Sequence, residues 1–171
     1  MWDTENGVFR GDEINMVKPG FNSGWMKMDG LWKPKTPEAL KIPTPFKLVD
    51  FDGRGEYKSP ELTLNFTVGF TALVFLDSKM LGKEYENDLF VAGYNNGKLY
   101  HFDLSDNRNS LELHNLLADR IANSTKELKD VEFASGLGMI TDLEIGPDGY
   151  MYVLSHTERE ATIYRIVPTN T

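Results

Sequence analysis

The last part of the chain reads GMITDLEIGPDGYMYVLSHTEREATIYRIVP over residues 138–168, and this stretch decides the fold. Ile140 to Ile145 and Tyr150 to Leu154 are strand-length apolar runs, separated by Gly-Pro-Asp-Gly at 146–149. A last strand is expected over Thr162 to Val167. Strand, turn and strand in succession predict an antiparallel sheet built from hairpins.

The same pattern occurs earlier in the chain. Strands are expected over Leu62 to Asp77, Asp88 to Ala92 and Lys98 to Leu104, with a tight turn at 94–97 between the last two. The Asn-Gly pair at 96–97 suits this turn because both residue types tolerate positive φ angles. Alternation along 98–104 predicts one buried face and one wetter face.

Many short antiparallel strands separated by Gly, Pro, Asn and Asp predict an all-β protein, and the repeated hairpins favour a propeller with four-stranded blades. At roughly 45 residues a blade, the chain holds fewer than four. Asp3 to Glu13 has no preceding strand to pair with. We therefore expect about three C-terminal blades, with the N-terminal blades of the propeller absent from this sequence.

Composition divides the chain, residues 1–171, into five parts of one domain. Prolines at 34, 37, 43, 45 and 60 favour a loop over an inner strand, because proline donates no hydrogen bond to a sheet. Leucines between Leu111 and Leu128 predict one or two short helical turns. The expected parts are a turn-rich motif (1–31), a Pro-rich loop (32–60), a blade (61–104), an insert at the rim (105–135) and a closing blade (136–168).

Bulk properties exclude several functions. The net charge of -8 argues against nucleic-acid binding, which needs a basic surface. No apolar run approaches the roughly 18 residues of a membrane span, and no targeting signal is present in this sequence. The absence of cysteine removes thiolate chemistry and leaves oxygen ligands as the expected metal chemistry.

Two further stretches carry a resemblance to a known family. NGVFRGDEIN at 6–15 and KPGFNSGW at 18–25 resemble the signature NGPxGGDEIN…KPGxNYGW of the soluble pyrroloquinoline-quinone glucose, aldose and sorbosone dehydrogenases, with its spacing retained. Residues 138–168 resemble the closing blade of that family, and 73–104 the blade before it. The resemblance implies the C-terminal part of a six-bladed propeller, a sugar substrate, pyrroloquinoline quinone and Ca²⁺ at the axial top surface, and an extracellular or periplasmic location.

The resemblance also implies site residues. Gly7 and Val8 occupy the places whose carbonyl oxygens bind the cofactor's calcium in relatives, where proline is usual at the second place. Asp12, Glu13 and the carbonyl of Ser23 match a structural calcium site. Two adjacent acids beside a glycine turn, with a carbonyl returning from the next turn, are the hard ligands that calcium prefers. The alternative is that the two acids only solvate a turn.

The sequence departs from the family where cations hold the quinone. The two expected arginines align with Met139 and Thr141, and the expected lysine falls at Asn95-Asn96, so Asn95 and Thr141 are our quinone-facing positions. Charge-assisted hydrogen bonds from cations are what retain a trianion. The family's catalytic histidine lies in an upstream blade.

Other candidate residues have ordinary structural explanations. None of His101, His114 and His156 matches a catalytic position of the family, and all three are expected to be structural; His156 is the most interesting because it follows a strand end. Tryptophans at 2, 25 and 32 suit a sugar-stacking platform, but we favour buried packing for Trp25.

Two hypotheses for function follow. In the first, the chain belongs to a quinone-dependent dehydrogenase that oxidises the anomeric carbon of a sugar to a lactone, and contributes calcium and carbonyl contacts but no base. In the second, the propeller is non-catalytic, keeps the structural calcium and binds carbohydrate or protein. The substitutions at 139 and 141 favour the second.

Overall fold

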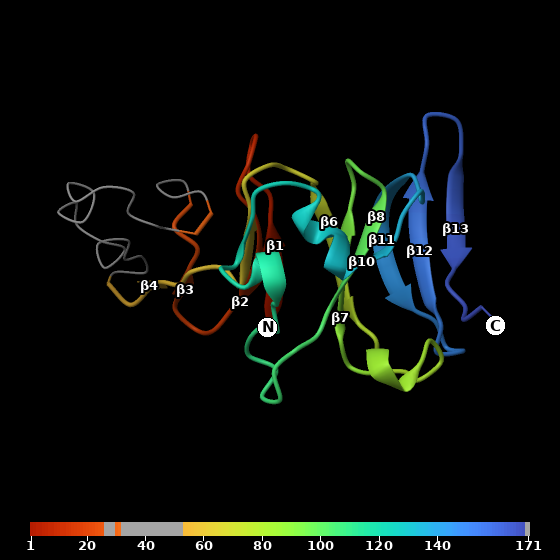
Figure 1. Ribbon diagram of the computed structural model, residues 1–171, viewed down its shortest axis with the longest axis horizontal. Helices are drawn as coiled ribbons and strands as arrows, with labels where there is room; N and C mark the ends of the chain where they lie inside the picture. Colours follow the sequence, from red (N-terminus) through yellow and green to blue (C-terminus); the bar gives the residue numbers. More distant parts are fainter. Residues whose placement is uncertain (26–29, 32–52, 170–171) are drawn as a thin grey trace.

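The computed structural model describes residues 1–25, 30–31 and 53–169. Among these residues the strands form three larger sheets and one two-stranded sheet, which lie one after another along the long axis of the molecule (Figure 1). No helix in the described part is long and apolar enough to cross a membrane. Trp32 and most of the predicted Pro-rich loop lie outside the described residues.

The first sheet has the order β1-β2-β5-β9. Its strands are β1 (Trp2–Glu5), β2 (Asp12–Met16), β5 (Leu62–Leu64) and β9 (Ile121–Ala122), all antiparallel except for the parallel β5–β9 pair. Strand β1 was not anticipated. The small parallel sheet of β3 (Phe21–Asn22) and β4 (Glu56–Tyr57) extends from this end.

The second sheet has the order β10-β8-β7-β6 and is antiparallel throughout. Its strands are β6 (Phe70–Phe75), β7 (Leu89–Gly93), β8 (Lys98–Phe102) and β10 (Glu132–Ala134). The β7–β8 hairpin is confirmed, and Gly97 has the positive φ of +61° that its turn requires.

Two expectations for this region were wrong. The expected strand over Leu62 to Asp77 is divided, because the segment between β5 and β6 leaves the first sheet and enters the second. One face of β8 was expected to contact solvent. Leu99 on that face is fully buried instead, because the third sheet covers it. Strand β5 belongs to the first sheet, and the fourth strand of the second sheet, β10, lies within residues 105–135.

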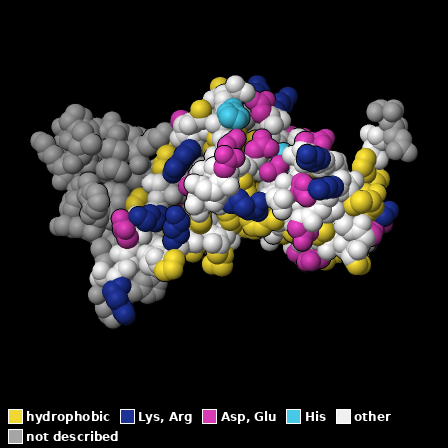
Figure 2. Space-filling view, turned by 90° about the horizontal axis from the view of Figure 1, so that it is seen from below, with side chains coloured by type: hydrophobic (Ala, Val, Ile, Leu, Met, Phe, Trp, Pro, Cys, Tyr) yellow, Lys and Arg dark blue, Asp and Glu magenta, His cyan; other side chains and the backbone are white. Residues whose placement is uncertain are grey.

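The third sheet has the order β11-β12-β13. Its strands are β11 (Met139–Ile145), β12 (Met151–His156) and β13 (Ala161–Arg165), so the closing hairpins predicted from the sequence are confirmed. Hydrophobic side chains gather at this end of the molecule (Figure 2), where Ile163 is 68% exposed.

Short 3-10 turns connect the strands. They are η3 (Lys83–Tyr85), η4 (Asn115–Leu117) and η5 (Glu127–Val131), and the last two confirm the helical turns predicted between the sheets.

Two hydrophobic cores hold the sheets together. One lies between the first and second sheets around Ile14, Phe70 and Tyr100, and the other lies between the second and third around Phe90, Ile140 and Val153. Burying each large apolar side chain contributes roughly 1.5–3 kcal/mol. Because both cores are continuous across neighbouring sheets, the strand ends and their turns are fixed relative to one another.

Candidate functional site

The Asp12 carboxylate joins three segments of the chain. The side chain is fully buried and accepts hydrogen bonds from the backbone N–H groups of Gly7 (3.1 Å), Val68 (2.7 Å) and Gly69 (2.8 Å), and from Thr67 Oγ1 (2.8 and 2.9 Å to its two oxygens). A buried charge needs this many donors to offset its lost hydration. Asp12, expected as a calcium ligand, is thus saturated by protein donors and fixes the 67–69 segment.

The 67–69 segment connects Asp12 with the β7–β8 turn. The N–H groups of Tyr94 and Asn95 donate to the carbonyls of Gly69 (2.9 Å) and Val68 (2.8 Å). A Cβ atom on Gly69 would lie 3.1 Å from Asn95 Nδ2, so the segment and the β7–β8 turn are closely packed. The 67–69 segment therefore contacts both Asp12 and the β7–β8 turn.

Glu13 lies on the opposite face of β2, because successive side chains of a strand alternate. Its carboxylate is 4% exposed and accepts hydrogen bonds from the N–H of Gly30 (2.8 Å) and from Asn15 Nδ2 (3.1 Å). The register places Glu5 directly opposite Glu13. Like charges directly opposite each other are destabilising, so this pair favours a bound cation.

Two buried oxygens on the same face have no hydrogen-bond partner. They are Asn15 Oδ1 and Thr63 Oγ1, and Thr63 is the cross-strand neighbour of Glu13 on β5. Orphaned buried oxygens are rare in folded proteins and indicate a missing partner. Together with two carboxylates, they fit a hard cation such as Ca²⁺.

Beside these residues is a hollow of about 210 Å³, here called the Glu13 cavity. The structure brings three predicted site residues to it, namely Gly7, Glu13 and Ser23, and adds Glu5, which the sequence reasoning missed. Glu5 could be identified only from the pairing of β1 with β2. The cavity is lined by Glu5, Asn6, Gly7, Gly11, Glu13, Ser23 and Trp25.

Two other residues of this motif are exposed. Val8 is 67% exposed and is not part of the cavity lining. Trp25 is 59% exposed at the cavity, so the prediction that it packs in the core was wrong. An exposed indole beside a polar cavity is available to contact a ligand.

A second hollow, of about 390 Å³ and here called the His156 cavity, opens where the β7–β8 turn meets the end of β12. The His156 Nε2 atom is 3.3 Å from the hydroxyl of Tyr94, and the two rings lie 5.7 Å apart. Asn95 and Met139, two of the positions aligned with the family's cations, line it. The lining is Tyr94, Asn95, Asn96, Gly97, Gly136, Gly138, Met139, His156, Thr157 and Glu158.

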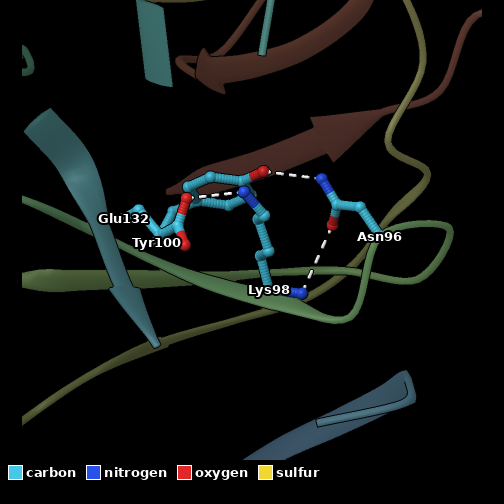
Figure 3. A network of polar contacts seen from close by, with 4 residues as sticks. All are labelled: Asn96, Lys98, Tyr100 and Glu132. Carbon is cyan, nitrogen blue, oxygen red and sulfur yellow. Dashed lines mark hydrogen bonds and ion pairs between the residues drawn. The ribbon is translucent and has the colours of Figure 1, made fainter. Parts of the chain in front are cut away.

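A polar network holds the Asn96 rim of this cavity (Figure 3). Asn96 Nδ2 donates to the Tyr100 hydroxyl (2.7 Å), and Asn96 Oδ1 accepts from the backbone N–H of Lys98 (3.3 Å). The Lys98 ammonium pairs with Glu132 at 2.6 Å. Burial, opposed by the Asn96 hydrogen bond, raises the pKa of Tyr100 to about 12, so the hydroxyl stays neutral.

The remaining candidates lie elsewhere. Thr141 is exposed, and its hydroxyl donates to the carbonyl of Leu154 (3.2 Å) outside the His156 cavity. His114 is exposed before η4, and His101 pairs with Asp88 beyond the far end of the β7–β8 hairpin. Only His156 of the three histidines lines a cavity described above, as its position after a strand end suggested.

The charge of the two cavities does not fit a trianionic quinone. Among the described residues that line them there is no lysine or arginine, whereas glutamates line both. Charge-assisted donors to the quinone's carboxylates are missing from this lining. We therefore derive no step through the quinone.

Stacked, largely antiparallel sheets of up to four strands are typical of the blades of a β-propeller. The chain belongs to the glucose / sorbosone dehydrogenase family, whose model matches residues 1–165. The fold and the family expected from the sequence are confirmed.

Solved structures with this fold include a crystal structure of glucose dehydrogenase (TM-score 0.64, 20% identity) and the apo-form of the soluble aldose sugar dehydrogenase from Escherichia coli (0.61, 20%). The PQQ-bound aldose sugar dehydrogenase from Streptomyces coelicolor is similar too (0.57, 14%). Each match covers 96% of this chain but only 40%, 40% and 38% of the other. A search of curated proteins found no match. The presence of further N-terminal blades in the protein stays a prediction.

Proposed function

We propose that this chain is the C-terminal part of a sugar-dehydrogenase-like propeller. It binds a sugar at the His156 cavity and Ca²⁺ at the Glu13 cavity, and it does not bind a quinone. The observation that carries the proposal is the hydrogen-bonding lining of the His156 cavity, which holds no lysine or arginine at the positions where relatives are expected to place cations. Family membership supports a sugar as the ligand. A location outside the cytoplasm is proposed on the family resemblance alone.

The side chains of the His156 cavity suit a polyhydroxylated ligand. Tyr94 and His156 offer ring faces and a polar edge, and the amides of Asn95 and Asn96 both donate and accept hydrogen bonds. The Glu158 carboxylate adds an acceptor for a sugar hydroxyl. This mixture of aromatic faces and a few polar groups is typical of small-molecule sites.

Calorimetric titration of the purified protein with a panel of aldoses tests this proposal. We expect saturable binding to one or a few aldoses, and a loss of about fivefold or more in affinity for His156→Ala, the effect of one hydrogen bond. His114→Ala, at an exposed histidine away from the cavity, is the matched control and should bind as the wild type does. Equal affinity in the wild type and His156→Ala would place the sugar elsewhere.

The calcium proposal rests on Glu5, Glu13 and the backbone of Ser23. Two carboxylates and a carbonyl are an ordinary oxygen ligand set for Ca²⁺, and the orphaned oxygens of Asn15 and Thr63 lie on the same face. Asp12 is left out because its oxygens are occupied by four donor groups.

Thermal melting in Ca²⁺ and in chelator tests the calcium site. At 100 times its Kd, Ca²⁺ should stabilise the wild type by about 2.7 kcal/mol and raise Tm by about 5–10 °C. Glu13→Gln should abolish this shift. Glu112→Gln, at an exposed glutamate in the segment that connects β8 to β9, should keep it. A shift that persists in Glu13→Gln would refute the site.

The second candidate function is quinone-dependent oxidation of the anomeric carbon to a lactone. It is favoured by the location of Gly7 beside the Glu13 cavity, where its carbonyl is the expected contact to a cofactor-bound calcium. Bound pyrroloquinoline quinone would supply a two-electron acceptor. This chain's residues would position calcium and sugar, and we propose no base among them.

Incubation with Ca²⁺ and pyrroloquinoline quinone, followed by gel filtration, separates the two candidates. We expect no stoichiometric quinone to remain with the protein and no reduction of an acceptor dye by aldoses. Retained quinone together with sugar-dependent dye reduction would establish the enzyme and overturn the non-catalytic proposal. Sugar binding without either result supports the first candidate.

A further inference from the structure

A cluster of three potential metal ligands lies at the opposite end of the β7–β8 hairpin from the His156 cavity. Asp88 immediately precedes β7, His101 is near the end of β8, and Asp103 follows β8. The five-residue strands place this cluster about 16 Å from the turn. It is therefore independent of the two cavities described above.

The three side chains converge because they share one face of the hairpin. His101 lies opposite Phe90 in the register, so Asp88 and Asp103, each two residues further out, project from the same face. His101 Nε2 is 2.9 Å from Asp88 Oδ2 and 3.7 Å from Asp103 Oδ1, and one ligand atom from each residue lies within 4.8 Å of the others.

These separations are those of a metal's ligands. Atoms bound to one ion at about 2.0–2.2 Å in tetrahedral or octahedral geometry are separated by about 2.8–3.6 Å for adjacent ligands. The 2.9 Å pair already has this spacing, and the 3.7 Å pair is only slightly wider.

The imidazole is held in place before any ion binds. Tyr85 packs edge-on against the His101 ring at 5.0 Å, and Phe90 and Phe133 lie at 5.0 and 6.5 Å. The side chains of Asp88 and His101 are 16% and 18% exposed, whereas that of Asp103 is 57% exposed. Two oriented ligands and one accessible ligand give an ion an entry path and leave positions open for water.

We propose that Asp88, His101 and Asp103 bind a divalent transition-metal ion of the Zn²⁺ or Co²⁺ type. One imidazole nitrogen with two carboxylates selects these ions over Ca²⁺ and Mg²⁺, which prefer all-oxygen sites. The ion takes the place of the hydrogen bond between His101 Nε2 and Asp88 Oδ2, with the neutral imidazole binding through Nε2 and carrying its proton on Nδ1. The ordinary alternative is a hydrogen-bonded His–Asp pair that only ties the strand ends together.

Titration of chelator-treated protein with Co²⁺, followed by visible absorption, and with Zn²⁺, followed by calorimetry, tests the site. We expect one saturable equivalent and no displacement by excess Ca²⁺. A protein that binds neither ion, or from which excess Ca²⁺ displaces Co²⁺, would overturn the proposal. The calcium proposal for the Glu13 cavity is tested with a different ion and a different variant. Failure of one proposal therefore leaves the other unaffected.

Asp103→Asn is the informative variant because the side chain is mostly exposed and folding does not depend on it. It should weaken Co²⁺ binding by about tenfold or more, as should His101→Gln. Asp106→Asn, an exposed aspartate three residues further along, is the matched control and should bind as the wild type does. Unchanged Co²⁺ affinity in Asp103→Asn would refute the ligand set.

Discussion

The buried carboxylates on the two faces of the first sheet, Asp12 and Glu13, have different surroundings. On the core face, Asp12 has four donor groups and no oxygen left for an ion. On the other face, Glu13 lies opposite Glu5 and shares its surroundings with two oxygens that have no partner. Adjacent acids in one motif thus have different surroundings, because the side chains of successive strand residues point to opposite faces of the sheet.

The contrast shows how to interpret buried charge. A carboxylate surrounded by protein donors has its desolvation offset within the fold, and removing it leaves donors unsatisfied. A carboxylate that accepts two hydrogen bonds but lies opposite a second carboxylate would gain further stabilisation from a bound cation. The number of donors around each oxygen therefore distinguishes the two roles better than burial does.

The largest expected effect is from Asp12→Ala. The free energy of unfolding should fall by about 3 kcal/mol or more, because four donors lose a charged acceptor and the 67–69 segment is released. Urea denaturation measures this loss. Asp3→Ala, at an exposed residue that accepts only the N–H of Thr4, should change stability by less than about 0.5 kcal/mol. Similar losses in the two variants would erase the contrast between the faces.

The next effect is an alkaline loss of stability through Tyr100, on the same core. Its pKa is raised to about 12, so its contribution is complete below pH 10 and disappears as pH rises toward 12, where the unfolded chain alone loses the proton. The two-unit difference corresponds to up to about 2–3 kcal/mol.

Chemical denaturation between pH 9 and pH 12 tests this. Tyr100→Phe should show a shallower fall in stability than the wild type, while Tyr164→Phe, on the partly exposed β13, should not. Parallel pH profiles for Tyr100→Phe and the wild type would contradict the burial of this hydroxyl as the cause.

The smallest effect tests the other face. Thr63→Val removes a hydroxyl that has no partner, so in chelator it should leave stability unchanged or raise it by up to about 1 kcal/mol. In Ca²⁺ the variant should gain less stability than the wild type. Melting curves with and without Ca²⁺ measure both quantities, and a clear loss of stability in chelator would mean that the hydroxyl is already satisfied.

Local pattern predicted much of the fold. Both hairpins follow from turn chemistry: Asn96-Gly97 between β7 and β8, and the Gly-Pro-Asp-Gly turn between β11 and β12. The division of 62–77 between two sheets was not predicted, although Gly69, with a positive φ of +65°, lies in the segment that separates β5 from β6. Three donors from this segment, gathered by Asp12 more than fifty residues earlier, turn the chain there.

For the candidate sites the balance is different. The order of residues indicated which acids and turns to examine, and the family resemblance indicated Gly7, Glu13 and Ser23, which the fold brings to one cavity. Glu5, His156 and the Asp88–His101–Asp103 cluster depend on strand register and on contacts between sheets.

By itself, the sequence determined the class of fold, the hairpins and the family, because turn residues and alternation act over a few positions. Only the tertiary structure decided which carboxylate is saturated by protein donors and which lies opposite a second carboxylate at a cavity. The reason is physical: the role of a buried charge depends on the donors and acceptors around it, and distant segments supply them.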